Sequence, residues 1–244
     1  MNIIMKESLN KKKDFLVLDN DKSKVVFSTA LDNRSFNRNT DEGKEALNSI
    51  VDDFNVKKVL YLNQVHSDKV YTYKNEENFI ENDGDGIITN ERNIAIGVFT
   101  ADCVPVIIVN EVNGVIGAVH SGWKGTFNSI TKIALDKMKE EYGVDHKYTK
   151  IYIGAHIRKC CYEVSEDLKT KFLEKMNIEE DILFTGRNLN LEACIEKNAI
   201  DSGVLGENIF TLNECTYCST NIKLHSYRKS EGSYGRLFSF AILK

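Results

Sequence analysis

The sequence predicts an α/β or α+β fold in which helices cover a mixed β-sheet. The centre of the chain contains valine- and isoleucine-rich runs of strand length, which are typical of strands buried on both faces. Other segments carry apolar residues at helical spacing. The chain has 244 residues, which is enough for one large domain. Because no repeat, low-complexity tract or linker divides it, we expect a single domain over residues 1–244.

The first part of the chain predicts three strands and one helix. A strand is expected at 24–28, and an Asn- and Asp-rich loop at 32–41 leads into a helix at 42–54. Two further strands are expected at 58–63 and 69–73.

The centre and the last part of the chain predict most of the sheet. Central strands are expected at 86–89, 94–99, 104–109 and 115–120. The expected later elements are helices at 129–142, 166–176 and 191–202 and strands at 151–153, 209–212 and 238–243. Pro105 is the only proline of the chain. Since it has no N–H to donate to a ladder, it is expected to mark a strand end or a bulge.

Charge and hydropathy argue against nucleic acid and membrane partners. Lysine and arginine number 32 against 36 aspartates and glutamates, a net charge of −4 that repels polyanions. The amino terminus shows no export signal. The most apolar stretch, 94–109, contains Asp102 and falls short of the roughly 20 residues that a membrane helix needs. We therefore expect a cytoplasmic protein whose six cysteines stay reduced.

Three residues have the chemistry of zinc ligands. His66 follows one expected strand, His120 ends another, and Cys103 lies between them in the sequence. A thiolate and two imidazoles suit zinc, and three protein ligands leave the fourth position open, as in catalytic sites. Spacing alone does not show that they converge. The alternative is a small buried cysteine and two hydrogen-bonded histidines at strand ends.

Two segments have the composition of anion-binding sites. Residues 120–126 run from a strand towards a helix with two glycines, and Lys124 adds a positive charge. Residues 226–236 gather Arg228, Lys229 and Arg236 with two tyrosines. Guanidinium groups match phosphate geometry, and tyrosine rings stack on bases or sugars. The alternatives are a tight turn and a solvated hairpin.

The other cysteines are expected to be structural. Cys215 and Cys218 form a Cys-x-x-Cys pair, but no second pair lies at zinc-ribbon spacing. The adjacent Cys160 and Cys161 could hardly chelate one ion without strain, and Cys194 stands alone. The acidic segment 82–86 resembles a calcium loop but lacks the later ligands, so a turn into a strand is expected.

Taken together, several blocks resemble the bacterial laccase-domain family, also called the multicopper polyphenol oxidase or purine nucleoside phosphorylase family. The blocks occur in the family's order and cover nearly the whole chain: Asn63-Gln64-Val65-His66-Ser67, Gly84-Asp85-Gly86-Ile87-Ile88-Thr89, Thr100-Ala101-Asp102-Cys103-Val104-Pro105, Gly117 to Thr126, Cys161-Tyr162-Glu163-Val164 and Ser226-Tyr227-Arg228 with Gly235-Arg236. The His-Ser-Gly-Trp-Lys-Gly block beside Ala-Asp-Cys-Val-Pro is highly specific.

The resemblance implies a four-layer α/β/β/α fold and a zinc ion held by His66, Cys103 and His120. It also implies phosphorolysis of adenosine, inosine, guanosine and methylthioadenosine, with adenosine deamination. The older oxidase name implies copper and phenols, and a related proposal is peptidoglycan-precursor editing. Where the family has an arginine after the first strand, this chain has Ala30. Arg34 is the nearby candidate for that anion contact.

The leading hypothesis is therefore a zinc-dependent purine nucleoside phosphorylase with a secondary deaminase activity. Its phosphate-binding candidates are Lys124, Arg228 and Arg236. Asp102 and Glu163 are the candidate proton carriers or partners of the metal ligands.

Three alternatives stay open. A copper phenol oxidase normally needs more histidines than the five present. A binding module would use a structural zinc ion in place of a catalytic one. A cysteine hydrolase would use Cys103 as the nucleophile and His120 as the base.

Overall fold

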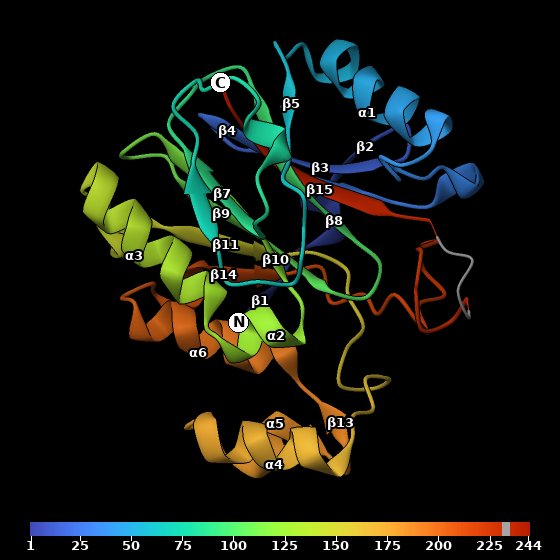
Figure 1. The fold of residues 1–244 in the computed structure, drawn as a ribbon, viewed down its shortest axis with the longest axis vertical. Coiled ribbons are helices and arrows are strands. Elements are labelled where there is room, and N and C mark those ends of the chain that lie inside the picture. The colour runs from blue at the N-terminus through green and yellow to red at the C-terminus, as the bar shows by residue number, and fades with distance from the viewer. Residues whose placement is uncertain (231–234) are drawn as a thin grey trace.

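The computed structural model, which describes residues 1–230 and 235–244, contains two mixed β-sheets that lie face to face with helices outside them (Figure 1). In the seven-stranded sheet the order is β1 (Asn2–Ile3), β14 (Ile209–Thr211), β11 (Lys150–Ile153), β9 (Val104–Asn110), β10 (Val115–Ser121), β7 (Gly86–Thr89) and β6 (Val70–Thr72). In the six-stranded sheet it is β2 (Asn10–Lys12), β3 (Phe15–Asp19), β4 (Ser23–Ser28), β15 (Leu237–Leu243), β8 (Ala95–Thr100) and β5 (Val59–Leu60).

The helices lie on the two outer faces. Helix α1 (Asp41–Phe54) covers the six-stranded sheet. The helices on the other side are α2 (Trp123–Phe127), α3 (Ile130–Tyr142), α4 (Glu166–Lys175), α5 (Glu180–Leu183) and α6 (Leu191–Asp201). A short hairpin of β12 (Phe184–Thr185) and β13 (Asn188–Leu189) follows α5. Figure 1 shows α4 and α5 beyond α6.

Three apolar layers hold this arrangement together. Between the sheets lie Ile87, Ile107 and Ile116 from one sheet and Phe27, Ile96 and Ala241 from the other. Between the seven-stranded sheet and its helices lie Val106, Ile108, Ile130, Leu135 and Ile195. Between the six-stranded sheet and α1 lie Val26, Phe240, Leu47 and Ile50. Each layer removes apolar surface from water, which is the main stabilising contribution to such a fold. The four-layer α/β/β/α arrangement is confirmed.

Helix ends follow local sequence signals. The side chain of Thr40 accepts a hydrogen bond from the N–H of Gly43 at the start of α1, and Ser165 does the same for Leu168 at the start of α4. These caps satisfy N–H groups that have no partner within the helix. Helix α3 ends at Gly143, whose φ of +64° suits the left-handed cap that glycine favours.

The central strands lie where the sequence predicts them. All residues of β7, β8, β9 and β10 are buried, as the valine- and isoleucine-rich runs indicate. Pro105 is the second residue of β9, at the strand end expected for it. In the antiparallel β9–β10 pair it lies opposite His120. This register brings His120 close to Cys103, which directly precedes β9.

Other boundaries differ from expectation. The strand expected at 58–63 is only the two residues of β5, because the chain then leaves the sheet edge to form the loop that carries His66. Strand β3 was not expected, although its Phe-Leu-Val-Leu run is an apolar strand signal. Helix α2 was not expected either, because its five residues are too short to show helical periodicity.

None of the helices within residues 1–230 and 235–244 combines the length and the apolar character that crossing a bilayer requires.

Candidate functional site

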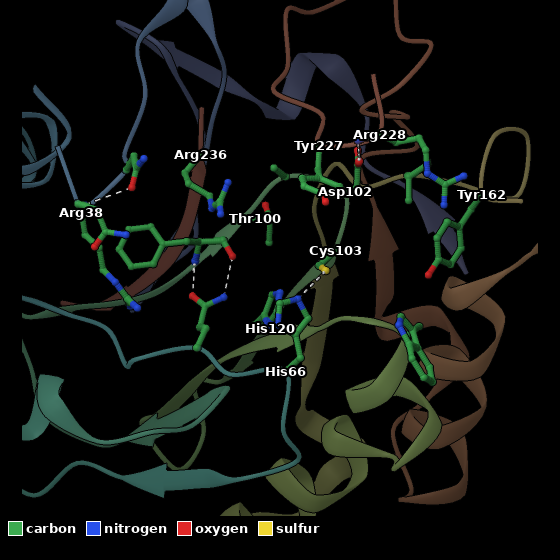
Figure 2. Close-up of a pocket in the computed structure, with 17 residues that line it drawn as sticks. Arg38, His66, Thr100, Asp102, Cys103, His120, Tyr162, Tyr227, Arg228 and Arg236 are labelled. Carbon is green, nitrogen blue, oxygen red and sulfur yellow. Dashed lines mark hydrogen bonds between the residues drawn. The ribbon is translucent and has the colours of Figure 1, made fainter. Parts of the chain in front are cut away.

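His66, Cys103 and His120 converge at one point of the structure (Figure 2). Their ligand atoms all lie within 4.8 Å of one another, and His66 Nε2 lies 3.8 Å from Cys103 Sγ. The two imidazole rings meet edge to face with their centroids 4.9 Å apart. The three residues come from the loop after β5, the turn directly before β9 and the end of β10. Of the two readings that spacing left open, the structure supports convergence.

Asp85 orients His120. The Nδ1 atom of His120 lies 2.7 Å from the Asp85 carboxylate, and the backbone N–H of His120 donates to the Asp85 carbonyl. Since both side chains are almost completely buried, the contact is shielded from water. Nδ1 therefore carries the proton, and Nε2 is left to face Cys103 and His66. Metal-ligating histidines are usually held by a carboxylate in this way.

The same carboxylate holds the His66 loop. Asp85 accepts hydrogen bonds from the backbone N–H groups of His66 and Ser67, at 3.1 and 2.6 Å, and from the Ser67 hydroxyl at 2.7 Å. His66 has a φ of +57°, a conformation that non-glycine residues seldom adopt and that needs support from its surroundings. One buried carboxylate thus positions both histidines.

The space between the three side chains fits a metal ion. A Cβ atom on Gly122 would lie 3.0 Å from the His66 ring and 3.1 Å from Cys103 Sγ. Glycine at this position therefore keeps a small gap open beside the ligand atoms. A cysteine sulfur and two imidazole nitrogens match the donor preference of zinc, and three protein ligands leave a coordination position for water or substrate.

In the metal-free cluster, Cys103 and His120 shift each other's pKa values. Burial disfavours a charged Cys103, but the neighbouring His120 and the hydrogen bonds from both histidines lower the pKa of its thiol to about 6. Burial likewise disfavours a charged His120, yet Cys103 and Asp85 raise its pKa to about 9. The thiolate form is the form that ligates metal, so these contacts favour the state that a metal requires of Cys103. His120 must instead release its Nε2 proton when a metal binds.

Asp102 accepts hydrogen bonds from three other loops beside the cluster. Its carboxylate accepts hydrogen bonds from the Thr216 hydroxyl at 2.5 Å and from the backbone N–H of Arg228 at 2.7 Å. Its carbonyl accepts from the N–H of Ile157. The φ of +92° at Asp102 is strained for a residue with a side chain. These contacts hold the turn that presents Cys103.

A cavity of about 590 Å³ opens above the cluster. This volume lies in the range of small-molecule sites. Arg228 and Arg236, two of the sequence candidates for anion binding, line it, and so does Asp102. The aromatic lining residues are Phe99, Trp123, Tyr162 and Tyr227. Figure 2 shows Arg236 and Arg38 on one side of the metal ligands and Arg228 with Tyr162 on the other.

Other sequence candidates lie elsewhere. Lys124 is not among the lining residues; its ammonium group lies over the Trp123 ring, 5.7 Å from the centroid. The side chain of Glu163 pairs with Arg187, away from the cavity. Only the backbone carbonyl of Glu163 approaches the site, where it accepts from the Arg228 guanidinium at 3.3 Å.

Arg34 does not provide the expected anion contact in this cavity. It pairs with the buried carboxylate of Asp14 and donates to Ser49. Its guanidinium also lies over the rings of Phe15 and Phe36, so its contacts are those of a structural residue. One further candidate, Tyr234 of the 226–236 segment, lies outside the described residues.

Sequence reasoning missed several residues of the site. Arg38 lines the cavity and donates to the Leu62 carbonyl at 2.5 Å, but it lies in an expected loop without a motif. Thr100 lines the cavity with a buried hydroxyl that has no hydrogen-bond partner among the described residues. Asp85 was expected in a simple turn. The signal that could have identified Asp85 as a site residue was its position inside the Gly84-Asp85-Gly86 block of the family resemblance.

The remaining cysteines are also placed differently from expectation. The sulfurs of Cys160, Cys161, Cys215 and Cys218 all lie within 4.8 Å of one another. These four cysteines were expected to be structural, but the sequence did not indicate that the adjacent pair and the Cys-x-x-Cys pair meet. The fold brings the loops after β11 and β14 together. Cys194 is buried in α6, apart from both clusters.

Comparisons with known proteins agree with the fold and identify the family. The family model described as multi-copper polyphenol oxidoreductase laccase matches residues 30–244. A Clostridium acetobutylicum protein named purine nucleoside phosphorylase is 42% identical over 233 residues, covering 96% of this chain and 97% of its own. An Aquifex aeolicus protein of the same name is 34% identical over 212 residues, 83% of this chain and 96% of its own. The crystal structure of hypothetical protein YfiH from Bacillus licheniformis superposes with a TM-score of 0.86 at 20% identity, covering 96% of this chain and 98% of that one.

Proposed function

We propose that this chain, which belongs to the family described as multi-copper polyphenol oxidoreductase laccase, is a zinc-dependent purine nucleoside phosphorylase that also deaminates adenosine. The proposed substrates are adenosine, inosine, guanosine and methylthioadenosine, each split by phosphate into a purine base and a sugar 1-phosphate. The names of the relatives support the phosphorylase activity. The zinc ion and the deaminase activity are supported by the chemistry of the ligand set.

The observation that carries this proposal is the composition of the cavity. It combines three metal-ligand side chains, three arginines and four aromatic rings within one space. Guanidinium groups bind phosphate through paired hydrogen bonds. Aromatic rings suit the flat purine. A neutral nucleoside and an inorganic phosphate need these two kinds of contact side by side.

The arginines and Thr100 that line the cavity are proposed to bind the two substrates. Phosphorolysis develops positive charge on the ribose and negative charge on the departing base, so phosphate must lie close to the anomeric carbon. Arg228, Arg236 and Arg38 are proposed to bind the phosphate. Thr100 offers a buried hydroxyl to the substrate. Lys124 stays a candidate from the sequence that would need its side chain to turn towards the cavity.

The proposed catalytic set consists of the three metal ligands, with Asp85 and Asp102 beside them. His66, Cys103 and His120 would hold the zinc ion, which when bound supplies Lewis acidity and lowers the pKa of a water ligand to about 7. Asp85 keeps His120 in the tautomer that leaves Nε2 to the metal. Both carboxylate oxygens of Asp102 already accept hydrogen bonds. This favours a positioning role for Asp102 over proton transfer.

The donor set gives little support to a copper oxidase. The chain has five histidines, and His66 and His120 alone among them line the cavity. His146 and His156 are buried elsewhere. His146 Nδ1 shares a hydrogen bond with the Thr149 hydroxyl, and His156 Nδ1 donates to the Gly154 carbonyl. A multinuclear copper centre normally requires more imidazole ligands than two.

The proposal is tested by resolving the products of adenosine. Zinc-loaded protein is incubated with adenosine in the presence and absence of phosphate, and adenine, inosine and ribose-1-phosphate are separated. Phosphate-dependent adenine with ribose-1-phosphate is expected from phosphorolysis, and inosine from deamination. Both should be lost in His120→Ala, whereas Arg92→Ala, whose guanidinium bonds to the Lys244 carbonyl, serves as a control.

Three outcomes would contradict the proposal. The first is the absence of both product sets, and the second is that wild-type rates survive in His120→Ala. The third is several copper ions per chain together with oxygen uptake on phenols, which would establish the oxidase alternative.

A further inference from the structure

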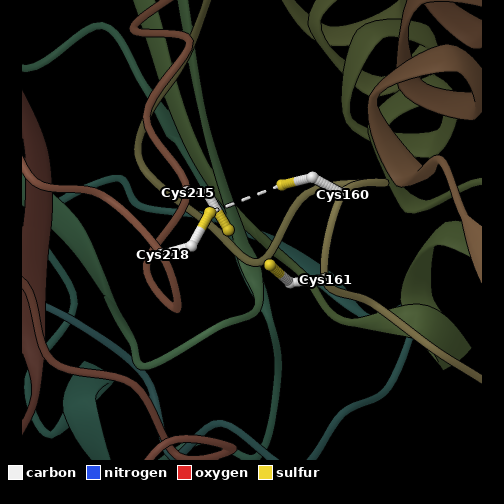
Figure 3. Close-up of side chains that lie close together, drawn as sticks. All are labelled: Cys160, Cys161, Cys215 and Cys218. Carbon is white, nitrogen blue, oxygen red and sulfur yellow. Dashed lines mark hydrogen bonds between the residues drawn. The ribbon is translucent and has the colours of Figure 1, made fainter.

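We propose that Cys160, Cys161, Cys215 and Cys218 form a second, structural metal site that binds a zinc ion through four thiolates. The four sulfurs come from two loops that are far apart in the sequence (Figure 3). Cys160 and Cys161 lie in the turn after β11, and Cys215 and Cys218 lie in the turn after β14. This site is distinct from the cluster of His66, Cys103 and His120.

The sulfur positions suit a single tetrahedral ion. All four sulfurs lie within 4.8 Å of one another, and those of Cys160 and Cys218 are 3.7 Å apart. Zinc–sulfur bonds of about 2.3 Å in a tetrahedron separate the sulfurs by roughly 3.8 Å. A disulfide needs about 2.05 Å, and all six cysteines are free. The spacing is therefore that of a coordination shell and not of a crosslink.

The Cys-x-x-Cys turn is shaped to stabilise a thiolate. Backbone N–H groups of Arg158, Cys218 and Tyr217 are directed at the sulfur of Cys215. The carbonyl of Cys215 accepts a hydrogen bond from the N–H of Ser219, which closes the turn. Hydrogen bonds to a ligating sulfur orient it and spread its negative charge.

Four thiolate ligands predict a structural role. A tetrahedral ion with four protein ligands has no open position for water or substrate, in contrast to the three-ligand cluster. Soft thiolate sets in tetrahedral geometry favour zinc among the common divalent ions. We therefore call the cluster of Cys160, Cys161, Cys215 and Cys218 the closed site, and the cluster of His66, Cys103 and His120 the open site.

The closed site would fasten two loops that shape the cavity. Cys161 is followed directly by Tyr162, which lines the cavity. Cys215 pairs with His156 in an isolated parallel bridge, and the neighbouring Thr216 reaches the Asp102 carboxylate. An ion held by both loops would keep these contacts in place. Its loss should loosen the cavity without removing a residue that touches the substrate.

The test counts zinc in the full-length protein purified under reducing conditions. The expected content is two zinc ions per chain. Cys160→Ser and Cys218→Ser replace exposed side chains, so folding should tolerate them, and each should lower the content to about one. Cys103→Ser should lower it to about one through the other site. Cys194→Ala, a cysteine outside both clusters, should keep two.

Cobalt substitution identifies which ion is lost. Thiolate-to-cobalt charge-transfer absorption grows with the number of cobalt–sulfur bonds, of which the closed site supplies four and the open site one. Cys160→Ser should therefore remove most of this absorption, and Cys103→Ser only a small part. The measurement uses the metal alone and needs no enzymatic activity.

The proposal fails if the reduced wild-type chain binds one zinc ion and that content is unaffected by Cys160→Ser and Cys218→Ser. It also fails if the protein isolated without reductant has an intact mass lower by two hydrogen atoms, recovered on reduction and absent in Cys218→Ser. That result would show a Cys160–Cys218 disulfide in place of a metal site.

Discussion

Asp85 and His120 form the contact on which the metal-ligand cluster depends: a 2.7 Å hydrogen bond between Oδ1 and Nδ1, with both side chains at most 3% exposed. The same carboxylate receives the N–H groups of the His66 loop. Asp85, which is not itself a ligand of the cluster, thus decides where two of the three ligand atoms lie. Asp85 therefore positions both histidines of the open site, and Cys103 is the third ligand.

Asp85→Asn should weaken metal binding at the open site by about 10- to 100-fold, the usual effect of losing a partner that orients a ligand. The amide can still accept some of the loop N–H bonds, so the fold should survive. Zinc affinity is measured by competition with a chelator. Asp83→Asn is the matched control, because Asp83 is exposed and bonds only to the Asn63 side chain among the side-chain contacts observed. Equal affinity in Asp85→Asn and wild type would contradict the role given to Asp85.

Gly122→Ala should reduce zinc binding while leaving the fold intact. The backbone φ of −69° suits alanine, but the new methyl group would lie 3.0 Å from the His66 ring and 3.1 Å from Cys103 Sγ. Gly206→Ala is the control, since a Cβ there meets nothing within 4 Å. Metal content and circular dichroism are compared for the two variants. Normal zinc content in Gly122→Ala would show that the gap beside the ligands is not needed.

Cys103 should be alkylated more rapidly than Cys160 when metal is removed. Its pKa is lowered to about 6 by His120 and His66 against the effect of burial, whereas burial and neighbouring sulfurs raise the pKa of Cys160 to about 11. Since the thiolate is the reactive form, Cys103 should react with iodoacetamide at pH 7 and lose reactivity as the pH falls through about 6. Peptide mass spectrometry locates the label. Zinc should protect Cys103, and preferential labelling of Cys160 would contradict the prediction.

Arg228→Ala should raise the KM for phosphate by about 10- to 100-fold, because hydrogen bonds to a charged group contribute roughly 1.5–3 kcal/mol. The KM for the nucleoside should change less. Arg228→Lys should restore only part of the loss, since lysine lacks the planar fork of guanidinium. Lys124→Ala provides the comparison: an effect on phosphate as large as that of Arg228→Ala would return Lys124 to the phosphate site.

Glu192→Ala should destabilise the fold by roughly 3 kcal/mol, the lower part of the range for breaking a buried ion pair. Glu192 is 4% exposed and accepts from Arg158 at 2.8 Å and Thr211 at 2.6 Å. Although burial opposes its charge, these donors and the nearby His156 lower its pKa. The contribution of Glu192 is therefore complete above its unfolded pKa of about 4.3 and is lost as the pH falls through the lower folded value.

Urea unfolding at several pH values measures this difference. Glu196→Ala on the same helix is the control, since its partly exposed pair with the amino terminus of Met1 should contribute at most about 1 kcal/mol. A destabilisation in Glu192→Ala no larger than that of the control would contradict the prediction.

Much of the fold could be predicted from the sequence because burial on both faces leaves a direct pattern. The boundaries of β7 match the expected strand, and those of β9 and β10 differ from it by one residue. The pattern fails at sheet edges. The strand β5 has only two residues, because an edge strand with one neighbour can leave the sheet wherever a loop requires it.

The sequence by itself determined the central strands, the main helices and the chemical type of the metal ligands, because apolar periodicity and donor chemistry belong to the residues themselves. The tertiary structure alone decided which donors meet. It placed Asp85 against His120, brought Arg38 to the cavity and joined Cys160 with Cys218, 58 positions later. Contacts between residues far apart in the sequence depend on strand register and on how two loops approach each other. Neither can be predicted from the local sequence pattern. For the same reason the sequence did not show that the four cysteines, which were expected to be structural, meet in what is proposed as one structural metal site.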